Sequence, residues 1–213
     1  MRTVAVLPVK RFTRAKQRLR AAVDGIARER LAAAMVGDVL QVVTALDELV
    51  RVIVVTAEPA AAQLADEAGA HVVRDPDEAG QSAAAALGIV AAVRELEAQR
   101  VLLVPGDTPG IDRDELLAIL ARTEPVVIVP DRHGTGTNGL LLAPPAAIAP
   151  AFGPGSRARH EAAARAAGVA CAILALPSLT HDVDTPEDLA ALRARGGLGP
   201  RTAAALAELA PVA

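Results

Sequence analysis

Short apolar runs alternate with stretches of helical spacing along almost the whole chain. The expected strands are residues 4–7, 52–55, 71–73, 101–104, 126–129, 140–142 and 170–176. The expected helices are residues 28–45, 59–68, 82–99, 112–121, 157–167 and 186–195. This alternation predicts an α/β three-layer sandwich with a mostly parallel, doubly wound sheet. Breaks near Pro130 and Pro150 predict one antiparallel excursion late in the chain.

The chain has 213 residues, of which 52% are hydrophobic, so it can bury a full core in a single domain. We expect this domain to span residues 1–195 and a tail to occupy residues 196–213. Residues 201–209 of the tail have the pattern of a short amphipathic helix. This helix is expected to pack on the body or on a partner subunit, so a homodimer is one expectation.

Composition excludes several classes of partner. A net charge of −3 gives no overall attraction to nucleic acid or to an anionic membrane. Two Phe and no Trp or Tyr leave no aromatic platform for single-stranded nucleic acid. No apolar stretch is long enough to span a membrane, so we expect a cytoplasmic protein. The single cysteine, Cys171, lies in an apolar run and is predicted to be a buried small hydrophobic residue.

A carboxylate, Asp107, follows the apolar run 101–104 directly after Pro105-Gly106. Ligands bind at the carboxyl ends of strands in open α/β sheets, which is where this residue is expected to lie. Asp107 could instead cap the next helix, but Asp112 is a better cap, with Glu115 as its capping-box partner. We therefore favour a metal or substrate role for Asp107 over simple solvation of a loop.

A basic segment follows the first expected strand, at the usual phosphate-binding position of doubly wound folds. Like charges in such a cluster repel one another unless a polyanion is nearby. The alternative is a solvated basic face. The segment contains no glycine, so it is neither a P-loop nor a dinucleotide-binding turn. It holds both lysines of the chain, and its cations are Lys10, Arg11, Arg14, Lys16, Arg18 and Arg20.

Two later segments have features of anion sites. Residues 131–139 read D-R-H-G-T-G-T-N-G, which could form an anion-binding nest or a flexible surface turn. Residues 152–160 read F-G-P-G-S-R-A-R-H, with Ser156 as the expected N-cap of a helix. Arg157, Arg159 and His160 then place positive charge in the first helical turn, which an anion would make favourable. Two anion sites suggest a nucleotide and a second phosphorylated or carboxylated substrate.

A second pair of carboxylates lies in the segment H-D-V-D-T-P-E-D-L, residues 181–189. Thr185 as N-cap, Pro186 at N1 and Asp188 at N3 satisfy the helix start without Asp182 or Asp184. One of these two aspartates can therefore face Asp107 across the sheet edge. A few hard oxygen ligands beside phosphates suit Mg²⁺ rather than Zn²⁺.

Five motifs, taken in order, resemble the 2-phospho-L-lactate/phosphoenolpyruvate guanylyltransferases of coenzyme F(420) biosynthesis. They are L-P-V-K-R-F-T-R-A-K-Q-R-L, V-P-G-D-T-P, D-R-H-G-T-G-T-N-G, F-G-P-G-S-R-A-R-H and D-V-D-T-P-E-D-L. The resemblance covers residues 3–195 and does not include the tail. It implies a nucleotidyltransferase fold of the glycosyltransferase-A type. It also implies GMP transfer from GTP to a phosphorylated three-carbon acid, with release of pyrophosphate.

The resemblance also implies roles for individual residues. Lys16 would bind the triphosphate and act in catalysis with Asp107. Asp107 and Asp184, with Asp182 as the alternative to Asp184, would hold Mg²⁺. The nucleotide would contact Leu7, Pro8, Lys10, Arg11, Lys16, Gly80 and Gln81. The acceptor acid would contact Thr137, Gly153 and Ser156. The chain departs from the common family pattern at Gly106, at Thr108 and in Gly80-Gln81-Ser82-Ala83.

Two other functions are compatible with the residues. One is a different nucleotidyltransferase of the same fold, such as a molybdopterin cytidylyl- or guanylyltransferase, although the glycine-rich first loop expected there is missing. The other is a non-catalytic nucleotide-binding module, which would not need Asp107, Asp184 and Lys16 together. The acceptor is phosphoenolpyruvate, 2-phospho-L-lactate or 3-phosphoglycerate, with phosphoenolpyruvate favoured because the Ala/Arg-rich composition resembles that of high-GC actinobacteria.

Overall fold

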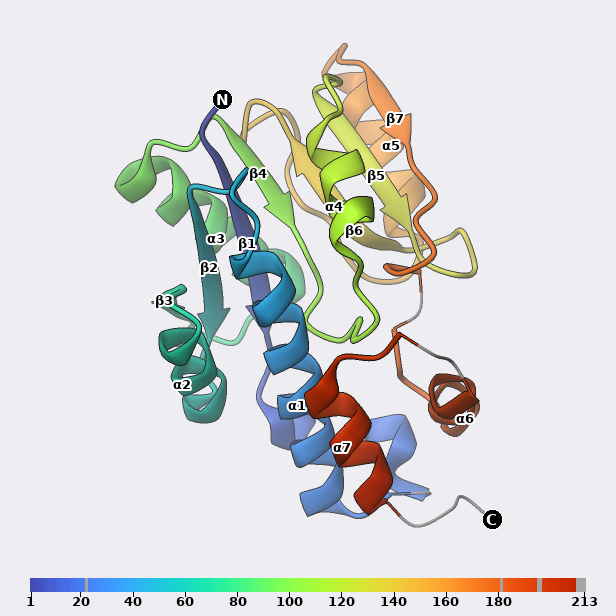
Figure 1. Cartoon of the computed structure of the whole chain (residues 1–213). Coiled ribbons are helices and arrows are strands. Elements are labelled where there is room, and N and C mark those ends of the chain that lie inside the picture. Colours follow the sequence, from blue (N-terminus) through green and yellow to red (C-terminus); the bar gives the residue numbers. More distant parts are fainter. Residues whose placement is uncertain (22, 181, 195–196, 210–213) are drawn as a thin grey trace.

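A computed structural model describes residues 1–21, 23–180, 182–194 and 197–209. It contains a seven-stranded sheet in the order β3-β2-β1-β4-β6-β5-β7 (Figure 1). The strands are β1 (Thr3–Val9), β2 (Arg51–Thr56), β3 (His71–Arg74), β4 (Arg100–Leu103), β5 (Val126–Pro130), β6 (Thr137–Leu142) and β7 (Cys171–Ile173).

Only one strand runs against the others. β6 pairs antiparallel with both β4 and β5, whereas the remaining neighbours in the sheet are parallel. This confirms the predicted late antiparallel excursion. As a result, β6 begins at the sheet edge where β4 and β5 end, because Leu103 lies opposite Leu140 in the register.

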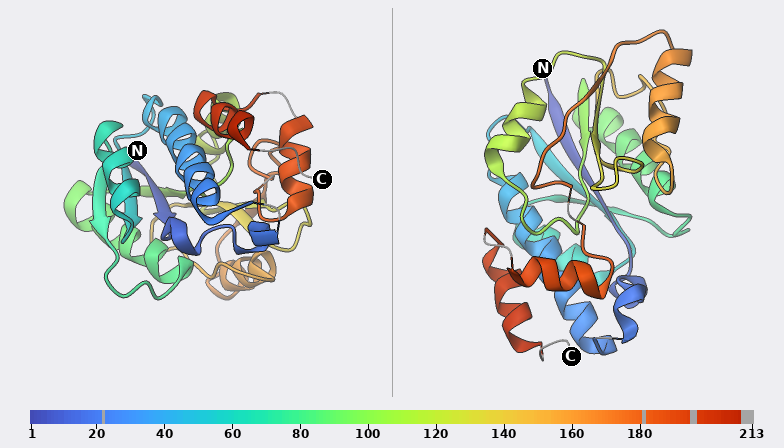
Figure 2. Two further views of the ribbon diagram at one scale, coloured as in Figure 1. Left: turned by 90° about the horizontal axis from the view of Figure 1, so that it is seen from below. Right: turned by 90° about the vertical axis from the view of Figure 1, so that its right-hand side faces the viewer.

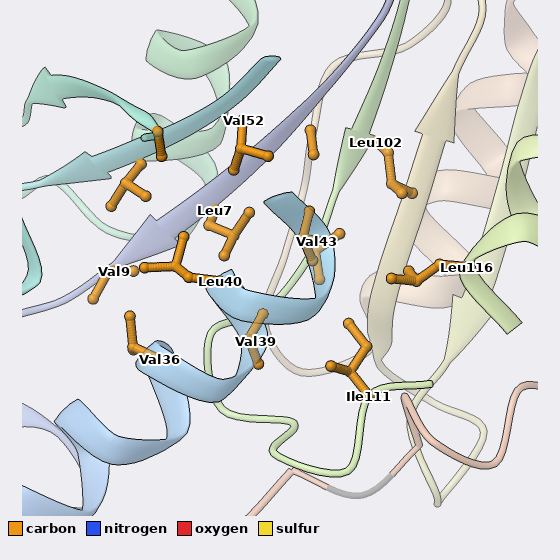
Figure 3. Close-up of a cluster of buried hydrophobic side chains, with 14 of the residues drawn as sticks. Leu7, Val9, Val36, Val39, Leu40, Val43, Val52, Leu102, Ile111 and Leu116 are labelled. Atoms are coloured by element: carbon orange, nitrogen blue, oxygen red, sulfur yellow. The ribbon is translucent and has the colours of Figure 1, made fainter. Parts of the chain in front are cut away.

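Helices cover both faces of the sheet, which makes three layers (Figures 1 and 2). One core cluster joins the sheet to α1, α2 and α4, and the cluster on the other face joins it to α3 and α5. Figure 3 shows part of the first cluster, with Leu7 of β1 beside Leu40 and Val43 of α1. These helices are α1 (Gly25–Thr44), α2 (Pro59–Glu67), α3 (Gln81–Leu96), α4 (Arg113–Leu120) and α5 (Ser156–Ala166).

A third, smaller cluster lies beyond the sheet. It packs Leu19 of the short 3-10 helix η2 (Gln17–Ala21) against Leu31 and Met35 of α1. Residues of α6 (Pro186–Ala194) and α7 (Pro200–Glu208) complete the cluster. The fold therefore places the basic segment, which also contains η1 (Phe12–Arg14), next to the C-terminal helices.

The C-terminal helix packs on the body, alongside α1 (Figures 1 and 2). The buried carboxylate of Asp38 accepts hydrogen bonds from the backbone N–H groups of Arg201 (3.1 Å) and Thr202 (2.7 Å) at the start of α7. A Cβ on Gly199 would lie only 2.1 Å from Asp38 Cγ, so a glycine is needed at this contact. The amphipathic tail helix was predicted, and it buries Thr202 and Leu206.

Several predicted boundaries differ from the structure. The first strand extends through Pro8 to Val9, and α1 begins at Gly25 because Asp24 caps it. The third helix ends at Leu96 rather than at residue 99, since Glu97 takes a left-handed conformation with φ of 52°. The strand predicted at 170–176 shortens to β7. Residue 195, where we expected α6 to end, lies outside the described residues.

Two side-chain predictions are wrong. Cys171 is exposed, because β7 is an edge strand that turns Ala172 inward and Cys171 outward. Asp112 does cap α4 by accepting from Glu115 N–H (3.0 Å), but the Glu115 carboxylate does not complete a capping box. It accepts a hydrogen bond from Ser178 N–H instead (2.9 Å).

In the part of the chain that the structure describes, no helix has the length and apolar character needed to cross a membrane.

Candidate active site

The candidate site is built around Lys16, whose ammonium joins two carboxylates from distant parts of the chain. Lys16 Nζ lies 2.6 Å from Asp107 Oδ2 and 3.3 Å from Asp184 Oδ1. The Lys16 side chain is only 5% exposed, whereas those of Asp107 and Asp184 are 36% and 45% exposed. The two carboxylates therefore share one cation and still face solvent.

The backbone holds Lys16 in an uncommon conformation. Its φ of 52° lies in the left-handed region, which costs free energy for a residue with a Cβ and is typical of functional positions. Leu19 N–H donates to the Lys16 carbonyl (2.9 Å) at the start of η2. The guanidinium of Arg28 in α1 donates to the preceding carbonyl, that of Ala15 (3.0 Å). Local packing thus directs the ammonium inward.

Electrostatics keep this lysine charged. Burial lowers the pKa of Lys16, but the negative charges of Asp107 and Asp184 outweigh burial and raise the pKa above its ordinary value. A third carboxyl is coupled to this pair. Burial, and then repulsion from Asp107 and Asp184, raise the pKa of Asp182. Such a concentration of negative charge is suited to a cation or to a cationic substrate group.

Asp182 also connects the carboxylates to β6. Asn138 Nδ2 donates to the Leu179 carbonyl (2.8 Å) and makes a long hydrogen bond to Asp182 Oδ1 (3.5 Å). Thr137, one of the predicted acceptor residues, is the neighbour of Asn138 at the start of β6. The predicted metal and acceptor segments therefore meet at one edge of the sheet.

The start of α6 confirms that Asp184 is free of a capping duty. Asp188 Oδ2 accepts from the N–H groups of Asp184 (2.9 Å) and Thr185 (2.8 Å), and Thr185 Oγ1 accepts from Asp188 N–H (3.3 Å). Arg132 forms an ion pair with Asp188. Burial raises the pKa of Asp188, but Arg132 and the backbone donors outweigh it, so the carboxyl stays ionised. The side chain of Asp184 is left to contact Lys16.

Internal ion pairs account for part of the basic segment. Arg11 Nε lies 2.8 Å from Glu78 Oε1, Arg14 Nη1 lies 3.4 Å from Glu78 Oε2, and Lys16 contacts its two aspartates. The prediction that these cations need a polyanion to relieve repulsion is therefore wrong for these three residues. Lys10 is exposed.

The other predicted nucleotide residues lie nearby in the fold but differ in accessibility. The Leu7 side chain is fully buried in the core (Figure 3), so only its backbone could meet a ligand, and Pro8 is partly buried in the same strand. Gly80 has a φ of 107° and is the N-cap of α3, whose first residue Gln81 is partly exposed. The sequence analysis did not identify Glu78 and Glu58, which contact the basic segment. Glu58 Oε2 accepts from Phe12 N–H (3.0 Å).

The predicted anion nest at residues 131–139 already surrounds a carboxylate. Asp131 Oδ1 accepts from Thr135 N–H (2.9 Å), and Asp131 N–H donates to the Gly136 carbonyl (3.3 Å). A Cβ on Gly136 would lie 2.5 Å from Asp131 Oδ2. At least one N–H group of the predicted nest is therefore taken by a side chain of the loop itself and is not open to an external anion.

The start of α5 differs from the prediction in two ways. Gly155, with φ of 70°, is the N-cap, and the buried Ser156 is the first helical residue. The positive charges of the first turn also have internal partners. Arg157 Nε contacts Glu161 Oε1 (2.8 Å), and Arg159 donates to the carbonyls of Ala151, Phe152 and Pro154. These arginines are therefore no argument for a bound anion.

His160 is the residue of this segment whose environment the sequence interpretation misjudged. It is fully buried, and burial followed by the charge of Arg159 lowers its pKa to about 4, so the imidazole is neutral. Its Nδ1 lies 3.0 Å from Thr137 Oγ1, and its Nε2 accepts from Ala151 N–H (2.8 Å). The spacing of Ser156, His160 and Ala164 at every fourth residue marks the buried face of α5 and could have revealed it.

Several known proteins are similar to the chain in sequence. The family model described as "Guanylyl transferase CofC like" matches residues 3–204, so the match extends into the tail that the motifs left out. A phosphoenolpyruvate guanylyltransferase of Conexibacter woesei is 50% identical over 91% of this chain and 88% of its own. A 3-phospho-D-glycerate guanylyltransferase of Phenylobacterium zucineum is 38% identical over 96% of this chain and 95% of its own.

A solved structure supports the fold. A nucleotidyl transferase from Methanothermobacter thermautotroptrophicus superposes with a TM-score of 0.63 at 17% identity, covering 91% of this chain and 96% of that one. At this identity the likeness concerns the fold alone. The nucleotidyltransferase-like three-layer fold that the motifs implied is thereby confirmed.

Proposed function

This chain belongs to the CofC-like guanylyl transferase family, and from that premise we propose that it transfers GMP from GTP to the phosphate of phosphoenolpyruvate. Pyrophosphate is the second product, and the reaction serves coenzyme F(420) biosynthesis. The observation that carries the proposal is the contact of Lys16 with both Asp107 and Asp184. A non-catalytic nucleotide-binding module has no need of a buried lysine held between two solvent-facing carboxylates.

The reaction requires no covalent enzyme intermediate. An oxygen of the acceptor's phosphate attacks the α-phosphorus of GTP, the bond from the α-phosphorus to the bridging oxygen breaks, and pyrophosphate leaves. Catalysis of such a step consists of positioning and of neutralising charge. Lys16 is suited to the second task because the raised pKa keeps its ammonium protonated beside the developing charge.

The donor set fits Mg²⁺. Asp107 and Asp184 each use one carboxylate oxygen on the Lys16 ammonium and are partly exposed, so each keeps oxygen ligands for a divalent cation. Mg²⁺ commonly takes one or two protein carboxylates together with substrate phosphates and water. Asp182 is the neighbouring carboxyl that could replace or assist Asp184. Among the described residues, no group of three or more His, Cys, Asp or Glu side chains is placed to hold a metal ion, so the substrate's phosphates and water would have to supply the remaining ligands. When bound, the ion would neutralise charge on the triphosphate.

The acceptor is proposed to bind at the start of β6 and α5. Thr137, Gly153 and Ser156 come together there, with Gly153 exposed at a φ of 105° and Ser156 N–H donating to the Gly153 carbonyl (3.0 Å). Lys10 and Arg11 of the basic segment, and Gly80 with Gln81, are proposed nucleotide contacts on the other side of the carboxylates. 3-Phosphoglycerate is a second candidate acceptor, favoured by the relative named for it.

The test is a pyrophosphate-release assay with purified protein and Mg²⁺. Each nucleoside triphosphate is paired with phosphoenolpyruvate, 2-phospho-L-lactate or 3-phosphoglycerate. We expect release with GTP and phosphoenolpyruvate, and much less with CTP or with GTP alone. Release that requires CTP would favour a different nucleotidyltransferase, and no release with any pair would favour a binding module.

A further inference from the structure

His160 stands where three segments of the proposed acceptor site meet. It projects from α5, four residues after Ser156, and the ring is completely buried. One ring nitrogen contacts Thr137 of β6, and the other contacts Ala151 in the turn that leads to Gly153. No other residue in the described parts of the chain is hydrogen-bonded to both segments.

The hydrogen bonds fix the tautomer of this ring. Ala151 N–H can only donate, so Nε2 is the acceptor and carries no hydrogen. The imidazole is neutral, since its pKa is lowered to about 4, and its single hydrogen is therefore on Nδ1. Nδ1–H donates to Thr137 Oγ1 (3.0 Å). The edge-on ring of Phe152, with centroids 5.4 Å apart, restrains the imidazole further.

This arrangement determines what the Thr137 hydroxyl can do. Because its oxygen already accepts from His160 Nδ1–H, the hydroxyl hydrogen is available for another acceptor. Among the described residues, His160 is the only hydrogen-bond partner of this hydroxyl. The phosphate and carboxylate of the proposed acceptor are groups that accept hydrogen bonds and, when fully ionised, donate none. A hydroxyl whose hydrogen is available to donate is matched to such a group.

We propose that His160 is a positioning residue for the acceptor acid: by donating to Thr137 Oγ1 it keeps the hydroxyl hydrogen available for an anionic group of the acceptor, and it holds the Ala151–Gly153 turn beside it. This inference rests on the proposed function, because it takes the acceptor to be a phosphorylated acid. His160 itself touches neither substrate, since it is completely enclosed.

Two variants separate the two contacts of the ring. In His160→Asn, the shorter amide reaches the position of Nδ1 and can still donate to Thr137, but it leaves Ala151 N–H without a partner. In His160→Gln, the longer amide reaches the position of Nε2 and can still accept from Ala151 N–H. The variant removes the hydrogen-bond donor to Thr137 Oγ1, so the orientation of this hydroxyl is no longer fixed. Both replace a ring by an amide, so we expect similar losses of thermal stability.

The experiment measures kcat and both KM values by pyrophosphate release at saturating partner substrate. For His160→Gln we expect the KM for phosphoenolpyruvate to rise about tenfold, the size typical of one hydrogen bond to a charged group, with the KM for GTP little changed. For His160→Asn we expect a clearly smaller rise. A general structural defect would instead raise both KM values, or lower kcat, in proportion to the loss of melting temperature in both variants.

Variants of Thr137 complete the test. Thr137→Val should raise the acceptor KM about as much as His160→Gln, and the double variant should be little worse than either, because both act through one hydroxyl. Thr137→Ser, which keeps the hydroxyl, should retain most of the affinity. Fully additive effects, or equal KM values in Thr137→Val and Thr137→Ser, would overturn the inference even if the His160 variants fold poorly. If the wild-type enzyme is active and the variants leave the acceptor KM unchanged, only this inference is refuted. If the wild-type enzyme releases no pyrophosphate, the proposed function is refuted and this inference with it.

Discussion

The decisive residue pair is Asp107 and Lys16. Asp107 could be singled out from sequence because a better cap, Asp112, left it without a structural duty, and the structure confirms that Asp112 caps α4. Lys16 was singled out as one of only two lysines. Their direct contact could not be foreseen, because it depends on the left-handed backbone at Lys16 and on packing by Arg28. Burial of the Lys16 ammonium then holds it against the Asp107 carboxylate.

We expect Asp107→Asn to reduce kcat by on the order of 10²-fold or more, since it removes a carboxylate from the proposed Mg²⁺ site and the nearest counter-charge of Lys16. The melting temperature should fall by no more than about 4 °C, because the side chain is partly exposed. Pyrophosphate release and thermal unfolding measure the two effects. Asp114→Asn, an exposed carboxylate in the first turn of α4, is the matched control. Near-wild-type turnover of the Asp107 variant would refute the metal role.

His160 predicts a pH dependence of stability. Its pKa is about 4 in the folded protein and near 6.5 when unfolded, so the unfolded chain takes up a proton that the folded chain refuses. Its contribution is fully present above pH 6.5 and is lost as the pH falls toward 4. One pKa unit corresponds to about 1.4 kcal/mol, so the loss is at most roughly 3 to 4 kcal/mol. Urea unfolding of wild type and His160→Gln at several pH values should show a shallower decline in the variant, and parallel curves would contradict the assignment.

At the scale of elements, short apolar runs predicted each strand of the described sheet, because a strand buried in a sheet needs such a run. The breaks near Pro130 and Pro150 predicted the antiparallel excursion. The ends were less accurate. α3 ends at Leu96 because the backbone of Glu97 is left-handed, and a glutamate does not predict this conformation. Cys171 was placed in the core because its neighbours are apolar, whereas the edge position of β7, a tertiary feature, exposes it. The charges at the start of α5 were misinterpreted because Arg159 donates to backbone carbonyls and Arg157 pairs with Glu161. The sequence pattern that we used does not reveal such partners.

The docking of α7 depends on one buried carboxylate. We expect Asp38→Ala to lower the free energy of unfolding by about 2 kcal/mol, because two N–H donors at the start of α7 lose their acceptor in a buried place. Denaturant unfolding measures this loss. Asp24→Ala is the control, since that side chain caps α1 at an exposed position and should cost about 1 kcal/mol or less. Equal losses in the two variants would mean that burial of the Asp38 cap adds nothing.

At the scale of the whole molecule, the site exists because strands far apart in sequence end or begin at one edge of the sheet. β1 leads into the segment of Lys16, β4 leads into Asp107, and β6 begins with Thr137 at the same edge because it runs antiparallel. The C-terminal part of the chain adds Asp184 and then α7, which packs against α1. The match of the family model to residues 3–204 agrees with this, since it takes in the first half of α7.

The most direct test of the account follows the label from GTP into the acceptor. Purified enzyme is given phosphoenolpyruvate, Mg²⁺ and GTP labelled either at the α-phosphorus or at the γ-phosphorus, and the products are separated. The account predicts that the α label enters the acid-containing product, that the γ label leaves in pyrophosphate, and that Asp107→Asn and Asp184→Asn nearly abolish both. Transfer of the γ label to the acid, or unchanged α transfer in both variants, would contradict it.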